Sequence, residues 1–216
     1  AGNCLTAHHC EILIKHVTKE EVKQGLSDIP GTKSPGLDGY GSQFYKDAWH
    51  IIGDEVTLAI QSTYNSGMLL KQINSTSISL IPKVEVPENV TQFHPIACCN
   101  TLYKTLTKVL CARLNEILPD IINPAQSAFI KGRDIVGNLL ICQDLIRMYG
   151  RGICSPRIIM KLDLHKAYDS LEWSFIAEIL EELGFPNRIH NLIIQCVSSP
   201  TFTFTINGES FGFVTG

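Results

Sequence analysis

The sequence lacks the features that would place it in several specialised classes of protein. No apolar run approaches the roughly 20 residues that a membrane-spanning helix needs, so we expect no membrane partner. Internal repeats and low-complexity tracts are also missing. Charged residues make up only 18% of the chain and its net charge is -3, which weakens any claim of nucleic-acid binding from the overall field. The 216 residues and the hydrophobic content of 44% are those of an ordinary globular protein with one substantial domain or two small ones.

The N-terminus lacks an initiator methionine and the basic and then apolar segments of a secretory signal peptide, so we expect an internal piece of a longer reading frame. Eight cysteines are scattered through apparent helices and strands. Without a secretory signal, we expect reduced, mostly buried thiols instead of disulfides. Cys4, His8, His9 and Cys10 have the residue types of a zinc site, but their spacing matches no common tetrahedral pattern, so no zinc is predicted.

Basic residues are nevertheless concentrated in one stretch of the chain. Residues 147–166 carry five cations against one acid, Asp163, so a carboxylate is embedded in basic sequence. Phosphate backbones bind surfaces of this kind. A solvated loop and strand edge would account for the same charges, so the stretch alone does not assign a partner.

Hydrophobic spacing and capping signals predict that helices dominate the chain. Thr18 and Glu21 form a capping box at the start of the first predicted helix, which stops at Pro30. Turn-forming residues fill 30–39 and indicate a surface loop that contains one lysine. The predicted helices cover residues 19–28, 42–67, 100–118, 134–149, 174–183 and 186–197.

The predicted helix over 100–118 is strongly amphipathic, and Pro119 is expected to end it. Its inward face is expected to carry Leu102, Leu106, Val109, Leu110 and Leu114. Its outward face is expected to carry Lys104, Lys108 and Arg113.

Two regions outside the segment 157–169 predict strands. Residues 77–82 alternate polar and apolar side chains and form a strand whose end presents Lys83, followed by a polar loop. Residues 201–206 and 210–214 alternate around Asn207-Gly208, the best two-residue hairpin signal in the chain.

The segment 157–169 carries the residues with the clearest chemical meaning. Its apolar positions 158–160 predict a short buried strand that ends at Asp163, and the ring of Tyr168 follows five residues later. A carboxylate on a rigid strand end suits a divalent ion that orients phosphates and an attacking oxygen, although one acid cannot make such a site alone. Taken singly, Asp163 is equally consistent with a helix cap. Tyr168 taken singly is better explained by core packing.

Several motif strings occur together in this sequence. They are residues 33–39 (KSPGLDG), 80–83 (LIPK), 93–96 (FHPI) with Asn100, Tyr103, Lys104, Lys108 and Arg113, 126–130 (QSAFI), 132–133 (GR) and 161–173. Their order and rough spacing, from about residue 18 to the end of the chain, resemble the reverse transcriptases of non-LTR, LINE-like retrotransposons, especially those abundant in plant genomes. The joint match is far more specific than any one string.

The resemblance implies an RNA-directed DNA polymerase with a right-hand architecture. The implied fold class is α+β, helix-rich with a small, mostly antiparallel sheet, and comprises the fingers and a partial palm. Residues 1–17 would be an N-terminal flanking segment, 18–156 a fingers-like region and 157–216 a partial palm. A member of this family is expected to add deoxynucleotides from their triphosphates to the 3′-hydroxyl of a DNA primer on an RNA template. The expected cofactor is Mg²⁺, and the expected location is inside the cell, in the nucleus or cytoplasm.

The resemblance also implies roles for individual residues. Asp163 looks like a catalytic, metal-binding aspartate, with the backbone carbonyl of Leu164 as a further metal ligand. Tyr168 resembles the aromatic steric gate that leaves no room for a 2′-hydroxyl. Lys83 and Arg133 are expected to approach nucleotide phosphates or template. Template contact or plain solubility is expected for Lys104, Lys108 and Arg113.

The sequence departs from the family pattern in two places. His94 stands where the family has arginine, and it replaces a permanent bidentate cation by a ring that is mostly neutral near pH 7. The chain also ends before the hairpin that bears the family's paired aspartates and before the thumb, so a two-metal site would be incomplete. We therefore expect no polymerase activity from these residues alone, and poor solubility because a palm strand would lack its neighbour.

Two other functions stay open at this point. A non-catalytic retrotransposon remnant would bind RNA through basic surface without chemistry, and its binding would weaken steeply with salt. An unrelated metal hydrolase would need further clustered acids or histidines, and the sequence supplies no second motif of that kind.

Overall fold

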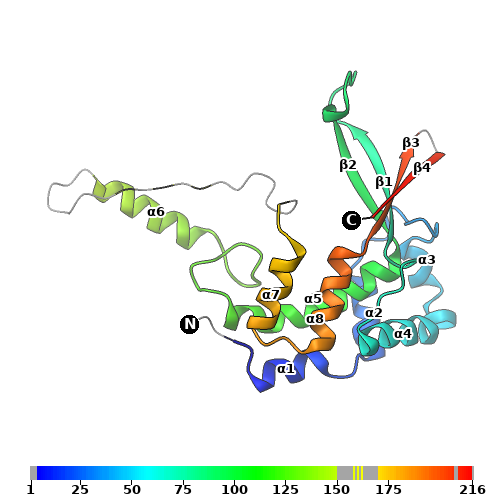
Figure 1. The fold of residues 1–216 in the computed structure, drawn as a ribbon, viewed down its shortest axis with the longest axis horizontal. Helices are drawn as coiled ribbons and strands as arrows, with labels where there is room; N and C mark the ends of the chain where they lie inside the picture. Colours follow the sequence, from blue (N-terminus) through cyan, green and yellow to red (C-terminus); the bar gives the residue numbers. More distant parts are fainter. Residues whose placement is uncertain are drawn as a thin grey trace.

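The computed structural model describes residues 4–149, 158, 160, 162, 170–206 and 209–215. The expectations for Asp163, Leu164 and Tyr168 lie outside the described residues, so they stay predictions. Figure 1 shows a body of helices from which a narrow sheet projects at one end, while α6 extends away at the other.

Helices make up most of the described structure, and the strands form one small sheet. The helices are α1 (Ala7–Ile14), α2 (Lys19–Ser27), α3 (Ser42–Asp47), α4 (Trp49–Ser66), α5 (Thr101–Ile121), α6 (Val136–Tyr149), α7 (Trp173–Glu182) and α8 (Asn187–Ser198), with a short 3-10 helix, η1 (Val90–Gln92). The strands are β1 (Ser75–Pro82), β2 (Phe93–Cys99), β3 (Thr201–Ile206) and β4 (Glu209–Thr215). This arrangement confirms the expected helix-rich α+β class.

The core is built around α5, which packs against α1, α2 and α4. A Cβ atom on Gly25 of α2 would lie 3.3 Å from the Thr105 carbonyl oxygen of α5, so glycine permits the close approach of these two helices. Each aliphatic side chain buried from α5 stabilises the fold by about 1.5–3 kcal/mol. The buried aliphatic residues of α5 are Leu106, Val109, Leu110, Ile117 and Ile121.

Local capping signals set the ends of several helices as predicted. The Thr18 hydroxyl accepts a hydrogen bond from the Glu21 N–H at 3.2 Å, and the Glu21 carboxylate accepts one from the Thr18 N–H at 2.9 Å. This reciprocal pair confirms the capping box of α2. Gly67 ends α4 in the left-handed conformation, with φ 67°. The predicted helix over 42–67 is divided at Ala48 into α3 and α4.

Pro119 does not end α5, so that prediction was wrong. The helix continues to Ile121, and the Ile122 N–H still donates to the Leu118 carbonyl at 3.0 Å. A proline in the last turn removes only its own N–H from the helical ladder, and the turn after it can still close.

The sheet has the strand order β2-β1-β3-β4. The pairs β1–β2 and β3–β4 are antiparallel, and β1 and β3 are parallel, so the sheet is mixed but mostly antiparallel. The strands predicted on either side of Asn207-Gly208 do pair, although those two residues lie outside the described structure. The β1–β2 pair projects from the helical body (Figure 1).

The strand β2 was not predicted from the sequence. Its Pro95 has no N–H to donate, which makes the string read as a poor strand. Within the described sheet β2 is an edge strand, where a proline is tolerated, and Pro95 lies opposite Leu80 of β1.

The buried strand predicted before Asp163 is not found at its three described positions. Ile158, Met160 and Leu162 are 90%, 73% and 80% exposed, and none of them lies in a strand. A strand is stabilised by pairing with a neighbour and by burial of its side chains. These three residues do not pair with the described strands β1–β4.

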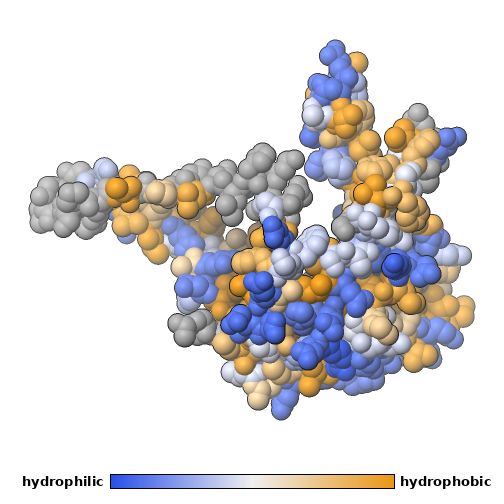
Figure 2. All heavy atoms as spheres, in the orientation of Figure 1, coloured by the Kyte–Doolittle hydropathy of each residue, from blue (hydrophilic) through white to orange (hydrophobic). Residues whose placement is uncertain are grey.

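The helix α6 exposes its side chains to solvent along its described length. Figure 2 shows hydrophobic residues gathered along this helix, well away from the sheet. They include Leu139, Leu140, Ile141, Leu145 and Ile146, which are 46–61% exposed. A helix normally buries such a stripe, so α6 presents an apolar surface without a partner among the described residues.

The described cysteines Cys4, Cys10, Cys98, Cys99, Cys111, Cys142 and Cys196 are free thiols, which confirms the expectation of reduced cysteines for these positions. Only Cys196 among them is buried, so the expectation of mostly buried thiols was wrong. The reason is that Cys98 and Cys99 lie on the edge strand β2, while Cys111 and Cys142 lie on outer helix faces. None of the helices in the described part of the chain has the length and apolar character needed to span a bilayer.

Candidate nucleic-acid interface

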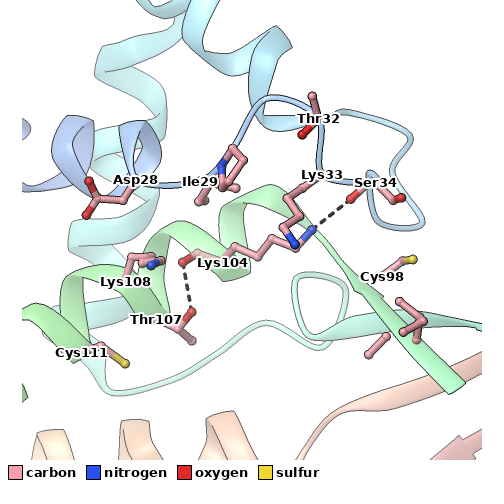
Figure 3. Close-up of a pocket in the computed structure, with 13 residues that line it drawn as sticks. Asp28, Ile29, Thr32, Lys33, Ser34, Cys98, Lys104, Thr107, Lys108 and Cys111 are labelled. Atoms are coloured by element: carbon pink, nitrogen blue, oxygen red, sulfur yellow. Dashed lines mark hydrogen bonds between the residues drawn. The ribbon is translucent and has the colours of Figure 1, made fainter. Parts of the chain in front are cut away.

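A pocket of about 630 Å³ lies where the loop after α2 meets α5 and β2 (Figure 3). The loop contributes residues 28–30 and 32–34, and β2 contributes residues 96–98. The remaining lining residues come from α5 and are Lys104, Thr107, Lys108 and Cys111. Lys104 lies three and four residues before Thr107 and Lys108, and Cys111 lies four and three residues after them, so the four positions share one face of the helix.

Cationic side chains dominate the charge of this pocket. Lys33, Lys104 and Lys108 line it, against Asp28 as the one acid among the lining residues. Figure 3 shows Lys33, from the loop, and Lys104, from α5, extending toward the same part of the pocket. The Lys104 ammonium donates to the Ser34 carbonyl at 3.0 Å, and Asp28 accepts a bond from Gln24 at 2.7 Å.

The ammonium groups of Lys33 and Lys108 are available to a ligand. Both side chains belong to exposed residues, and neither makes a hydrogen bond or ion pair with another described residue. Lys104 is half-buried and its bond to Ser34 holds the loop against α5. The pocket therefore combines one lysine that positions the loop with two that can bind an anion.

Asn100 fixes the loop that carries Lys33. It is 5% exposed, and its Oδ1 accepts a hydrogen bond from the Asp38 N–H at 3.4 Å. Its Nδ2 donates to the carbonyls of Gln72 at 2.9 Å and Ile73 at 3.3 Å. One buried amide thus joins the loop, the segment before β1 and the start of α5.

Gly36 lets the loop come this close to α5. A Cβ atom at this position would lie 2.1 Å from Asn100 Oδ1 and 2.5 Å from the Asn100 backbone nitrogen, so any side chain here would clash with Asn100. The Thr101 hydroxyl adds a bond to the Tyr40 carbonyl at 2.9 Å. The string at 33–39 is therefore an ordered loop packed on the N-terminal end of α5.

Lys83 lies apart from this pocket. It follows β1 at the projecting end of the β1–β2 pair, and its ammonium donates to the Thr91 carbonyl at 3.1 Å. His94 is also exposed near that end, opposite Ile81. The pocket is lined by β2 residues nearer its other end, so Lys83 and His94 do not line it. The predicted contact of Lys83 with nucleotide phosphates or template stays a prediction.

Arg133 binds the chain that follows α5. Its Nη1 donates to the carbonyls of Asn123 at 2.8 Å and Gln126 at 2.9 Å. Its Nη2 donates to those of Pro119 at 2.7 Å and Ile122 at 3.0 Å. The bonds to Pro119 and Ile122 satisfy carbonyl groups at the end of α5, where intrahelical partners are missing, and those to Asn123 and Gln126 hold the segment that follows. The predicted contact with nucleotide or template stays a prediction, and it would require some of these bonds to be exchanged.

Arg113 does not point outward, so the prediction of its orientation was wrong. Its side chain is only 1% exposed and forms an ion pair with Glu21, with 3.0 Å between Arg113 Nη2 and Glu21 Oε2. Its guanidinium also donates to the carbonyls of Leu13, Lys15 and His16. This buried position leaves Arg113 no surface to offer a nucleic acid. Helical spacing placed it on the polar face, but the charge is paired inside the helical body.

The ion pair between Arg113 and Glu21 shifts the pKa of both groups. Burial alone lowers the pKa of Arg113, but the hydrogen bonds that it donates to Glu21 and the nearby Tyr64 outweigh this effect and raise the pKa above its usual value. Burial likewise raises the pKa of Glu21, but bonds from Arg113 and the Thr18 N–H outweigh it and lower the pKa below 4.5. Both groups are therefore held in their charged forms at neutral pH.

Lys33 was not predicted as a site residue, whereas Lys104 and Lys108 were. The structure brings all three to one pocket. The signal in the sequence was a lone cation in a loop that is otherwise made of turn-forming residues. Its significance depends on the contact with Asn100, which no local pattern reveals.

Known proteins match this chain over most of its length. A family model described as reverse transcriptase (RNA-dependent DNA polymerase) matches residues 81–216. The transposon TX1 uncharacterized 149 kDa protein of Xenopus laevis is 28% identical over 169 residues, which cover 78% of this chain and 13% of that protein.

Two retrotransposon polyproteins are also similar. The retrovirus-related Pol polyprotein from type-1 retrotransposable element R2 of Popillia japonica is 27% identical over 132 residues, which cover 61% of this chain and 18% of that protein. The retrovirus-related Pol polyprotein from type-2 retrotransposable element R2DM of Drosophila melanogaster is 25% identical over 180 residues, which cover 83% of this chain and 16% of that protein. This chain thus spans less than a fifth of the length of these relatives. By the family match over residues 81–216, the chain belongs to the reverse transcriptase (RNA-dependent DNA polymerase) family, in the form found in non-LTR retrotransposons.

Proposed function

We propose that this chain supplies the fingers and the first part of the palm of an RNA-directed DNA polymerase. The observation that carries the proposal is the family match over residues 81–216. The longer protein joins deoxynucleotides, from their triphosphates, to a DNA primer 3′-hydroxyl on an RNA template. Residues 18–156 form the fingers-like region, 157–216 the partial palm and 1–17 a flanking segment. A plant element is the proposed source, on the resemblance of the motif strings taken together.

The proposed metal site uses Asp163 and the backbone carbonyl of Leu164, both outside the described residues. A carboxylate and a carbonyl are hard oxygen donors of the kind that Mg²⁺ prefers, so these donors fit the ion. Bound Mg²⁺ would polarise the triphosphate and activate the primer oxygen. Tyr168 is the proposed steric gate, whose ring excludes a ribonucleotide by occupying the space of its 2′-hydroxyl.

The lysines have separate proposed roles. Lys104 and Lys108 contact the template strand, which the cationic pocket on α5 supports, and Lys104 does so by exchanging its bond to the Ser34 carbonyl. Lys83 approaches the incoming triphosphate, which is supported by its exposed position after β1. Lys83 would then offset phosphate charge where His94 supplies no permanent cation.

Primer extension tests this proposal. The longest reading frame that contains these residues should extend a DNA primer on an RNA template with Mg²⁺ and deoxynucleotides. Asp163→Asn should abolish extension, and Tyr168→Ala should admit ribonucleotides while extension with deoxynucleotides persists. The 216 residues alone should be inactive, because two-metal catalysis needs more than one carboxylate. Extension that survives Asp163→Asn at the unaltered rate would contradict the proposal.

A further inference from the structure

The pocket beside α5 has a cationic side and an apolar side. The cations are those of Lys33, Lys104 and Lys108. The apolar side consists of Ile29, Pro30, Ile96 and Ala97. Its volume of about 630 Å³ lies within the roughly 300–1,000 Å³ typical of pockets for small ligands. This combination suits a ligand in which an anionic group is joined to a flat, weakly polar group.

The cationic side favours an anionic group, such as a phosphate, over a neutral ligand. Lys33 and Lys108 come from different elements, the loop and α5, so they can bind one phosphate from two sides or two successive phosphates. Asp28 is the only acid among the lining residues, and its carboxylate already accepts a bond from Gln24. The pocket therefore keeps a surplus of positive charge for an anion.

We propose that this pocket binds one nucleotide of a single-stranded RNA, with the phosphates on Lys33 and Lys108 and the base against Ile96 and Ala97. The inference rests on the proposed function in that the RNA is the template, but the binding step needs no catalytic residue. Bases inside a duplex are stacked and paired, so they cannot enter a concave pocket, whereas an unpaired base can. No aromatic side chain lines the pocket, so we expect little preference among bases.

Two thiols report on occupancy of the pocket itself. Cys98 and Cys111 line it, and Cys142 is an exposed thiol on α6 that does not. The 216-residue chain is alkylated with N-ethylmaleimide in the presence and absence of a short oligouridylate, and the rate at each cysteine is measured by mass spectrometry. At an RNA concentration about ten times its Kd, alkylation at Cys98 and Cys111 should slow about tenfold, because only the unbound fraction reacts. Cys142 should react at its original rate.

Two double variants separate the pocket from general surface charge. Lys33→Gln with Lys108→Gln removes the two available cations of the pocket. Lys23→Gln with Lys71→Gln removes the same charge from exposed positions outside the pocket and serves as the matched control. The pocket variant should weaken oligouridylate binding about tenfold and reduce the slope of log affinity against log salt by about 1.4, because each single-strand phosphate contact contributes about 0.7. The control variant should bind like the original chain.

Protection by other ligands shows whether the pocket binds a single strand, a duplex or a free nucleotide. Uridine monophosphate should protect Cys98 and Cys111 only at much higher concentrations than the oligouridylate, and an RNA duplex of the same length should not protect them. Equal protection by the free nucleotide would overturn the assignment to a strand.

The outcome for RNA binding is distinct from that for polymerisation. If oligouridylate binds while Cys98 and Cys111 react at their original rates, the proposed RNA site in the pocket is wrong and the proposed polymerase function is unaffected. If the folded chain does not bind oligouridylate, the proposed RNA site is also wrong. Primer extension would still test the proposed polymerase function. Failure of Asp163→Asn to stop extension would overturn the proposed catalytic role while leaving thiol protection interpretable.

Discussion

Replacement of Arg113 by glutamine should destabilise the helical body strongly. The Arg113 side chain is 1% exposed, and its Nε and Nη2 donate to the two carboxylate oxygens of Glu21 at 3.1 Å and 3.0 Å. Its Nη1 donates to the carbonyls of Leu13 at 3.2 Å and Lys15 at 2.7 Å, and its Nη2 to that of His16 at 3.1 Å. One side chain on α5 thus binds the end of α1, the connection to α2 and α2 itself.

The size of the effect follows from what the substitution leaves behind. Removing one partner of a buried ion pair costs about 3–5 kcal/mol, because the other charge stays without compensation. The Glu21 side chain is 27% exposed, so water can solvate part of its charge and the lower end of that range applies. The Arg113 guanidinium also lies 4.8 Å from the centre of the Tyr64 ring, and the loss of that buried cation–π contact adds to the cost. We therefore expect Arg113→Gln to lower the free energy of unfolding by about 3–4 kcal/mol.

Urea denaturation measures this change. The midpoint should fall while the slope m stays the same, because the substitution changes stability and not the surface exposed on unfolding. In a chain of this size the loss corresponds to a melting temperature lower by about 6–16 °C. Lys108→Gln on the same helix is the control and should leave the midpoint unchanged, since the Lys108 side chain bonds no described residue. An unfolding free energy for Arg113→Gln within about 1 kcal/mol of the original would refute the role given to this side chain.

Two other predictions concern Glu21 and Gly36. The folded pKa of Glu21 is held below its usual 4.5, so its contribution to stability is present above that pH and is lost as the pH falls through the folded pKa. The difference in unfolding free energy between the original chain and Glu21→Gln should therefore shrink below about pH 4.5, and a difference that stays constant under acid would contradict this. Gly36→Ala should destabilise the chain by about 1–3 kcal/mol, because its Cβ would overlap Asn100. Gly137→Ala, in α6 with nothing within 4 Å of the new Cβ, should instead be neutral or stabilising by up to about 1 kcal/mol. Equal melting temperatures for the two glycine variants would count against the close contact at Gly36.

Features that depend on neighbouring residues were predictable from the sequence. The capping box of α2 needs only Thr18 and Glu21, and the end of α4 needs only a glycine that accepts a positive φ. The pairing of β3 with β4 is likewise specified by alternation on either side of a two-residue turn. In each case the stabilising groups are within a few residues of one another, so the pattern contains the whole interaction.

Features that depend on distant residues were not predictable in this way. Arg113 and Glu21 are 92 positions apart, and helical spacing alone assigns a charged side chain to the solvent face. β2 is stabilised by pairing with β1, a tertiary contact that overrides the poor strand propensity of Pro95. The roles predicted for Asp163, Leu164 and Tyr168 rest on resemblance to a family and not on a local pattern.

The contact between Gly36 and Asn100 explains how the strings at 33–39 and 93–113 come to line one pocket. The amide of Asn100 holds the loop at Asp38, and Gly36 removes the side chain that would force the loop away from α5. Without that approach, Lys33 could not line the same pocket as Lys108. The overall charge of -3 therefore says little about this surface, because packing by uncharged residues concentrates the cations locally. If the pocket binds RNA, its affinity depends as much on a glycine and an asparagine that need not touch the ligand as on the lysines that do.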